Sequence, residues 1–293
     1  MKSTIAAILF AAVAATAYGR EPGNEISVEI SGGLSSISYS SDFGSVKPGA
    51  GISAGINYLH RFNKNWGLGT GVNFRLYQSR MEFDKYSDSY FIAIASPAAG
   101  TGIDDFRFDY RYSGLKGAAL EEKQQAYYLS IPVFAQYEHD CGFYARLGVQ
   151  VNIPVGGNSK INYETLVTSG YFPYENATYT DIPAHGFSTY LEGEEKETLS
   201  YRVNGSLYAE VGWNWDFNDK YILYVGVNGE YGMGKAYKSK TASPQLLYND
   251  GDFGYTPVWG ADIADSNGGR KSVTEGKYNN YAVGLVLRYS FGW

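Results

Sequence analysis

The sequence predicts an all-β fold, an eight-stranded antiparallel up-and-down transmembrane β-barrel. Three observations support this fold class. Eight segments alternate apolar residues with small or polar ones, as strands with one apolar face do. The connections between these segments are alternately short and long. No run of about 18 apolar residues follows residue 19, which excludes a membrane-spanning helix, whereas a barrel needs only alternate apolar residues.

The first 19 residues have the pattern of a secretory signal peptide. Lys2 supplies the positive charge, an apolar run follows, and small residues place a cleavage site after Ala17 or Gly19. We therefore assign residues 1–19 to a signal peptide and residues 20–293 to the barrel domain.

Cysteine content argues against disulfide and CxxC chemistry, and net charge argues against nucleic-acid binding. Cys141 is the only cysteine, so the chain has no intrachain disulfide and no CxxC motif. The formal net charge of -6 argues against nucleic acid as a partner.

Each predicted strand is defined by the parity of its apolar residues. In chain order the alternating segments are residues 26–30, 52–58, 66–76, 127–137, 143–153, 201–217, 221–231 and 281–293. The last of them places Tyr281, Val283, Leu285 and Leu287 on one face, and Gly284, Val286 and Arg288 on the other. We expect the first and last strands to pair and close the barrel.

The lengths of the connections predict the topology. Short connections occupy residues 62–65, 140–142 and 218–220, and long ones occupy residues 40–48, 79–124, 156–200 and 232–277. Short turns on one side and long loops on the other are typical of the periplasmic and extracellular ends of an outer-membrane barrel. An even number of strands then places both termini in the periplasm.

The second long connection contains a predicted hairpin. Residues 86–94 and 106–112 both have a strand-like pattern. We expect this hairpin to extend beyond the membrane. A ten-stranded barrel, with the hairpin completing the wall, is the main alternative fold.

Aromatic residues gather at both ends of the predicted strands, as expected where amphipathic rings meet the lipid headgroups. Beside the short turns, the predicted girdle consists of Trp66, Tyr137, Phe143, Trp213, Trp215, Phe217, Tyr221, Tyr289, Phe291 and Trp293. Near the opposite ends lie Phe74, Tyr127, Tyr201, Tyr231 and Tyr281. The alternative is a secreted β-sandwich with these rings in its core.

The whole mature chain resembles a known family. The signal peptide, the eight alternating strands, the segment Tyr128–Val133 and the ending Tyr289–Trp293 together resemble the small outer-membrane protein β-barrel family of PorT-like and OmpA/OmpX-type proteins. This resemblance implies location in the cell outer membrane. The resemblance to PorT-like proteins implies an accessory role in secretion. Architectural motifs of this kind specify a fold better than an activity.

If the apolar parity faces lipid, charged residues fill the lumen. The predicted charge network consists of Glu29, Arg75, Arg146, Arg202, Glu210, Glu230 and Arg288. We expect two ionic layers, the lower one containing a Glu29–Arg288 contact. Buried ions of this kind must satisfy one another, and an eight-stranded barrel has room only for side chains. A narrow gated pore for small solutes is the functional alternative to a plugged lumen.

No enzyme active site, metal site or cofactor is expected. His60, His139 and His185 lie far apart in the sequence and do not accompany a serine and a carboxylate in a recognisable order. Asp250, Asp252, Asp262 and Asp265 lack the spacing of an EF-hand loop, and turn chemistry explains them.

Function is expected in the long loops, which exceed the usual connection of about 4–6 residues. We expect structural support or surface binding, with a secretion accessory role as the alternative. The expected partners are outer-membrane lipid, lipopolysaccharide, the barrel assembly machinery, and a surface ligand or a secretion partner. A monomer is expected.

Overall fold

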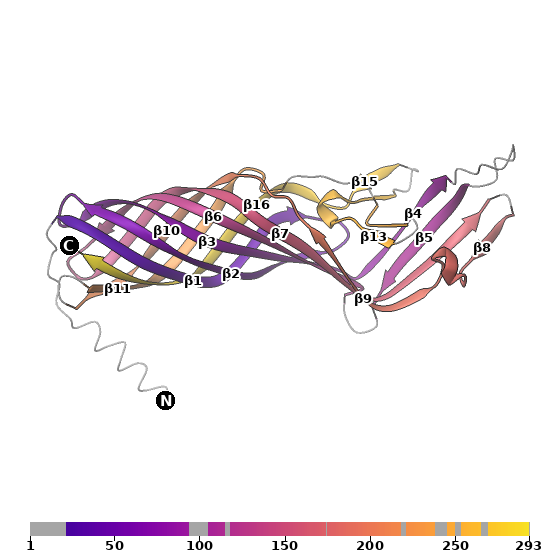
Figure 1. Cartoon of the computed structure of the whole chain (residues 1–293), viewed down its shortest axis with the longest axis horizontal. Coiled ribbons are helices and arrows are strands. Elements are labelled where there is room, and N and C mark those ends of the chain that lie inside the picture. The colour runs from indigo at the N-terminus through magenta and orange to yellow at the C-terminus, as the bar shows by residue number, and fades with distance from the viewer. Residues whose placement is uncertain are drawn as a thin grey trace, which may run out of the picture.

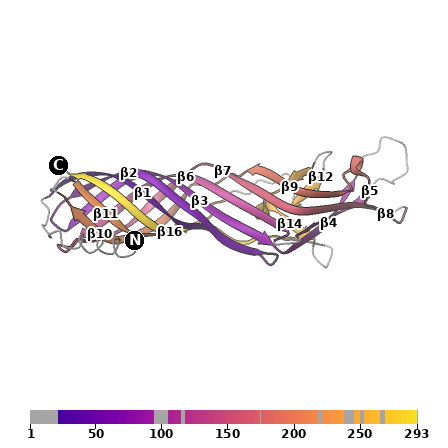
Figure 2. The same ribbon diagram turned by 90° about the horizontal axis from the view of Figure 1, so that it is seen from below.

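The structure is a computed structural model that describes residues 22–93, 105–114, 118–173, 175–217, 221–237, 245–249, 253–264 and 269–292. The predicted signal peptide and Trp293 lie outside these residues. The molecule is elongated, with a barrel at one end and a smaller sheet at the other (Figures 1 and 2).

Eight antiparallel strands form a closed ring, which confirms the predicted fold class. They are β1 (Gly23–Ser40), β2 (Ser45–Arg61), β3 (Trp66–Phe83), β6 (Leu120–Glu138), β7 (Phe143–Phe172), β10 (Asn204–Asp216), β11 (Tyr221–Met233) and β16 (Glu275–Gly292). Each strand pairs with the next in this order, and β16 pairs with β1 in a register that joins Ile26 to Phe291. The closed ring excludes the β-sandwich alternative.

The predicted parity sets the lipid face. Along β1, the side chains of Ile26, Val28 and Ile30 are exposed, while those of Glu25, Ser27 and Glu29 are buried in the lumen. An exposed apolar belt surrounds the ring. It extends from the short connections, which we call the turn end, to Leu34, Ile52, Phe74, Val155, Val203, Met233 and Val283. On β6 the half-buried Tyr127 lies at the same level, stacked on Phe74. About nine residues of β1 cross it, the length that a bilayer requires of a tilted strand.

Beyond the belt the hydrophobic pattern inverts. The inward-facing parity of β1 and β3, which is polar in the belt, supplies the fully buried Ile37, Met81 and Phe83. The same strands therefore leave the membrane-type pattern and build a water-excluding core. We call this part of the molecule the extension.

The extension contains most of the predicted loops as strands. β4 (Lys85–Ala93) and β5 (Asp105–Ser113) form the predicted hairpin. β5 pairs with β7 at residues 165–171, above the level where β6 ends, so the hairpin is not part of the barrel wall. The ten-stranded alternative is therefore wrong. β8 (Ala177–Tyr179) and β9 (Thr189–Thr198) also pair with β7, with the short helix η1 (Pro183–His185) between them.

Two boundaries differ from the prediction. The long connection expected at residues 40–48 is wrong, because β1 and β2 are separated only by residues 41–44. The sixth strand begins at Asn204 rather than at Tyr201, since Tyr201 forms an isolated bridge with Tyr237 and is buried.

The last long connection folds back over the far mouth of the barrel. Its elements are β12 (Leu247–Asn249), β13 (Phe253–Tyr255), η2 (Val258–Gly260), β14 (Asp262–Ala264) and β15 (Arg270–Ser272). Trp259 of η2 packs on Tyr39, Tyr201, Tyr237 and Tyr278, with ring centroids 4.6–5.9 Å apart. Among the described residues, no helix is long and apolar enough to cross a membrane.

Candidate functional site

The middle of the lumen holds two crossed ion pairs. Arg146 Nη1 lies 3.1 Å from Glu29 Oε2, and Arg288 Nη1 lies 3.6 Å from Glu210 Oε1. Glu29 and Arg288 face each other in the register of β1 and β16, as barrel closure predicts, but their ion partners lie on other strands. The expected side-chain contact between them is therefore replaced by pairs that cross the lumen.

Glycines make room for the aromatic rings of this layer. Gly212 and Gly226 are partners in adjacent strands, and Tyr144 is the next partner of Gly212. A Cβ atom at Gly226 would lie 2.5 Å from the Tyr144 hydroxyl oxygen. Because no Cβ atom lies there, the Tyr144 hydroxyl has room to donate a hydrogen bond of 2.7 Å to Glu210. In the same layer the Arg288 guanidinium stacks 3.8 Å from the Tyr224 ring centroid. Tyrosines and ion pairs thus fill the space together.

A second ionic layer lies nearer the turn end. Arg61 pairs with Glu25 at 2.9 Å and also with Glu138, and the Tyr224 hydroxyl donates to the Glu138 carboxylate at 2.8 Å. These three charges were not predicted from the sequence, although each continues the inward-facing parity of its strand. They lie one residue or more beyond the last apolar residue used to define the strand.

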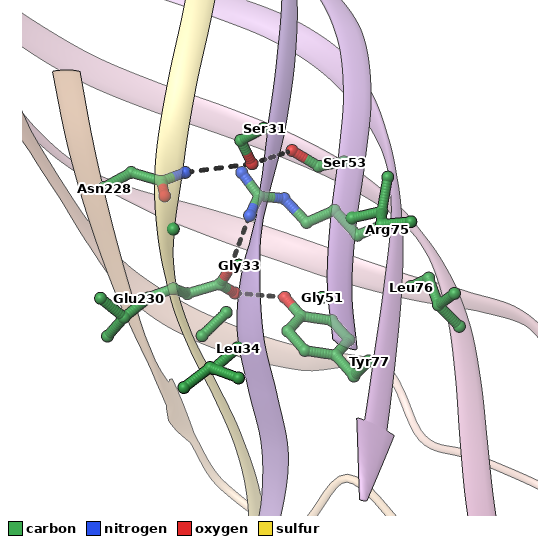
Figure 3. A pocket seen from close by; sticks show the side chains of 14 residues that line it. Ser31, Gly33, Leu34, Gly51, Ser53, Arg75, Leu76, Tyr77, Asn228 and Glu230 are labelled. Carbon is green, nitrogen blue, oxygen red and sulfur yellow. Dashed lines mark hydrogen bonds and ion pairs between the residues drawn. The ribbon is translucent and has the colours of Figure 1, made fainter. Parts of the chain in front are cut away.

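A third layer lies toward the far end of the belt. Arg75 Nη1 donates to Glu230 Oε2 at 2.7 Å, and the Tyr77 hydroxyl donates to Glu230 Oε1 at 2.6 Å (Figure 3). A cavity of about 20 Å³ lies beside this pair, between Ser31, Ser53 and Asn228. A water molecule needs roughly this volume, so the lumen is narrow at this level.

The structure therefore holds three ionic layers where two were expected. Six of the seven predicted charges lie in the middle and far layers. The prediction for Arg202 is wrong: its side chain is exposed, and its backbone N–H donates to the Ala236 carbonyl between Tyr201 and β10. Arg202 lies just above the belt, where the parity of the sixth strand no longer applies.

The turn-end aromatic residues form contacting groups on the lipid face. Trp66 lies 5.1 Å from Tyr137, Phe143 lies 5.6 Å from Trp213, and Tyr289 lies 4.9 Å from Phe291, measured between ring centroids. Tyr221 packs on both Tyr289 and Phe291, and Trp215 is half-buried beside Trp213 in sequence. At the far side of the belt, Phe74 and Tyr127 stack, whereas Tyr201 belongs to the buried mouth of the barrel and not to the girdle.

A buried carboxylate holds the folded-back connection in the far mouth. Glu122 of β6 is fully buried and lies outside the apolar belt. It accepts hydrogen bonds from Gln124 at 2.6 Å, from Ser159 at 2.7 Å and from the Val258 backbone N–H at 3.0 Å. All of these donors are neutral. Burial raises the pKa of the Glu122 carboxyl, and the hydrogen bonds only partly oppose this effect.

The extension carries a polar groove of about 450 Å³ on the outer face of β4, β5 and β7. Six of its lining residues come from adjacent strands in cross-strand register: Ser87, Ser89, Asp109, Arg111, Val167 and Ser169. Asp88 and Tyr110 of the same strands and Ala264 of β14 complete the lining. The opposite face of the same strands packs into the aromatic core of the extension. This groove is the second candidate site.

The histidines do not assemble into a catalytic group. His60 contacts Asn24 and His139 contacts Cys141, both near the turn end, whereas His185 lies in η1 of the extension. Among the described residues, no cluster of three or more histidine, cysteine or acidic residues could hold a metal ion. Asp262 lies in β14, and Asp250, Asp252 and Asp265 lie outside the described residues.

A match to a family model relates the chain to known proteins. A family model described as outer membrane protein beta-barrel domain matches residues 19–234. No curated protein matches the chain.

Solved structures with a similar overall trace include three bacterial barrels. Neisserial surface protein A is 11% identical, with 92% of this chain and 97% of that chain covered and a TM-score of 0.35. OprG from Pseudomonas aeruginosa is 11% identical, with 94% of this chain and 98% of that chain covered and a TM-score of 0.33. Ail, the attachment invasion locus protein of Yersinia pestis, is 11% identical, with 93% of this chain and 98% of that chain covered and a TM-score of 0.27.

Proposed function

Since this chain belongs to the outer membrane protein beta-barrel domain family, we propose that it is a surface-binding protein of the outer membrane. Its barrel anchors the chain in the lipid, and its extension contacts ligands outside the cell. In this proposal the short connections and both termini lie in the periplasm, and the far end is extracellular.

The observation that carries the proposal is the extension itself. Four wall strands, β1, β3, β6 and β7, continue beyond the apolar belt and share a buried core with the β4–β5 hairpin. Loops that only closed the barrel would need a few residues each. A packed extension with a polar groove instead presents a preorganised surface, which reduces the entropy cost of binding.

The filled lumen favours binding over transport. Three ionic layers and the rings around Trp259 occupy the lumen and its far mouth. Conductance steps of the purified protein in planar bilayers would instead favour the narrow gated pore. We further propose a non-enzymatic, monomeric protein that contacts outer-membrane lipid and lipopolysaccharide through the belt and reaches the membrane through the barrel assembly machinery.

Removing the hairpin tests the proposal. The Ala119 N–H donates to the Phe83 carbonyl at 2.7 Å, so β3 and β6 are already adjacent where the hairpin leaves. A short Asn-Gly link can therefore replace residues 85–117. The variant must retain heat-modifiable gel migration, which reports an intact barrel.

Cells displaying the full chain and the shortened chain are then compared for adhesion to mucin-coated and collagen-coated glass. We expect the full chain to increase adhesion to at least one coating, and the shortened chain to lose most of that increase. Equal adhesion by the two chains on both coatings would contradict a binding role for the extension.

A further inference from the structure

We propose that the groove on the outer face of β4, β5 and β7 binds an acidic glycan, a saccharide that carries carboxylate or sulfate groups. The inference rests on the proposed function, because it names the ligand class of the same extension. It is carried by the arrangement of the side chains on this face.

The groove is a regular array of mostly polar side chains. Ser87 faces Arg111, which faces Val167, in one row across the three strands. In the next row Ser89 faces Asp109, which faces Ser169. Neighbouring side chains in such rows lie about 5 Å apart, so several of them can contact one sugar ring together. Hydroxyl, carboxylate and guanidinium groups therefore alternate along the floor.

The charge on this face favours an anion. Arg107 donates to both carboxylate oxygens of Asp109, at 2.8 and 3.1 Å, which neutralises the aspartate. Arg111 lies on the same face two residues further along, is exposed, and forms no ion pair with any described residue. Lys85 adds a second exposed cation in the adjoining row. The groove is thus locally basic on a chain whose net charge is -6.

The remaining groups match the other parts of a sugar. Asp109 keeps lone pairs that can accept hydrogen bonds from ligand hydroxyls, and the serine hydroxyls can donate or accept. The next row supplies aromatic surface: Phe91 is 64% exposed, and the Arg107 guanidinium lies 5.0 Å from the Tyr171 ring centroid. A guanidinium such as that of Arg111 recognises carboxylate or sulfate with two parallel hydrogen bonds.

The floor of the groove is rigid. Asp88 points to the opposite face, where Arg270 donates to it at 2.8 Å and the Ala264 backbone N–H donates at 2.8 Å. Tyr110 also donates to Asp88, and its ring packs among Tyr86 and Tyr112. The strands that present the groove therefore have a fixed spacing before any ligand arrives.

Other anionic ligands fit less well. A nucleic acid would bring dense phosphate charge to a chain that is acidic overall, and it would leave Asp109 facing that charge. A lipid headgroup is held at the membrane surface, whereas the groove lies on strands that have left the apolar belt. An acidic glycan supplies both the anion for Arg111 and the hydroxyls for Asp109.

The test compares matched polymers on the full chain in detergent micelles. The probes are polygalacturonate oligomers, which carry one carboxylate on each ring, their methyl esters, which have the same rings without charge, and polyglutamate, which has carboxylates without sugar. We expect the polygalacturonate oligomers to bind most tightly. Equal binding of polyglutamate, or equal binding of the methyl esters, would overturn the proposal.

Two arginine variants locate the site. Arg111→Ala should weaken polygalacturonate binding about tenfold, as the loss of one charge-assisted contact predicts. Arg80→Ala is the matched control, because Arg80 is also an arginine on the outer surface, with a side chain that is 43% exposed, outside the groove. An unchanged affinity in Arg111→Ala, or equal losses in both variants, would exclude the groove.

This outcome is distinguishable from failure of the proposed function. If the hairpin deletion abolishes adhesion but Arg111→Ala leaves polygalacturonate binding unchanged, the extension binds another ligand and the glycan proposal is wrong. If the hairpin deletion leaves adhesion unchanged, the proposed function itself is wrong.

Discussion

Glu29 and Arg288 are direct neighbours across the seam that closes the barrel, yet each forms its ion pair with a different strand. Arg146 pairs with Glu29, and Glu210 pairs with Arg288. The middle layer therefore ties four strands together rather than only the seam. Breaking it should affect the whole barrel.

Removal of Arg288 should destabilise the folded barrel. Arg288→Met keeps an unbranched side chain but takes the nearer cation away from Glu210, at an expected cost of about 3 kcal/mol in unfolding free energy. Urea unfolding in detergent, followed by gel migration, measures the loss. Adding Glu210→Gln should recover part of it, because the buried negative charge is removed. A double variant no more stable than Arg288→Met would contradict this account.

Acid should strengthen the closure of the far mouth. The pKa of Glu122 is raised in the folded protein relative to its ordinary value of 4.5, so the folded state binds the proton more tightly than the unfolded state. Between that ordinary value and the raised pKa, unfolding free energy should decrease as pH rises. Above the raised pKa the full cost of the buried charge remains.

Glu122→Gln provides the control for this prediction. The amide does not titrate, so the variant should lose the part of the pH dependence that Glu122 causes. Unfolding free energies between about pH 4 and pH 8 test this. Equal pH slopes in the variant and in the unmodified chain would show that Glu122 is not the group responsible.

The tryptophans should report two different environments. Trp66 is exposed in the turn-end girdle, and Trp259 is buried in the mouth beyond the belt. In vesicles of lipids brominated on their acyl chains, a variant that keeps only Trp66 should be strongly quenched, and a variant that keeps only Trp259 should not. Quenching of Trp259 would place the mouth within the membrane, against the belt described above.

The single cysteine reports the orientation of the barrel. Cys141 is exposed in the turn between β6 and β7. A membrane-impermeant maleimide should label it only after the outer membrane is permeabilised. In a Cys141→Ser background, Ser87→Cys in the groove should be labelled in intact cells. The reverse pattern would show that the turn end faces outward.

The barrel could be predicted because lipid imposes a strict period of two on every wall strand. Ile26, Val28 and Ile30 show this period, and it located Glu29, Arg146 and Arg288 correctly on the inward face. Glu25, Arg61 and Glu138 follow the same parity, but they were missed because the apolar residues that mark a strand end before the strand does.

The extension could not be predicted in the same way, because β7 changes phase twice. The first change lies at Val155, which β7 inserts between the residues that pair with Tyr127 and Tyr128 of β6, and the second lies at residues 163–165, where pairing with β6 ends and pairing with β5 begins. The buried set therefore moves from Asn152 to Ser159 and Ile161, and back to Leu166 and Thr168. An alternation interrupted in this manner looks like a loop in the sequence. Which side chains meet in the groove depends on these shifts, which only the three-dimensional pairing reveals.

The continuity of β7 has a mechanical consequence. Its 30 residues run without a break from the turn end to the tip of the extension, a contour of roughly 100 Å at about 3.3 Å per residue. A load applied at the tip and directed away from the membrane would act along the strand axis. Many inter-strand hydrogen bonds would then resist it together in shear, instead of opening one after another as in unzipping.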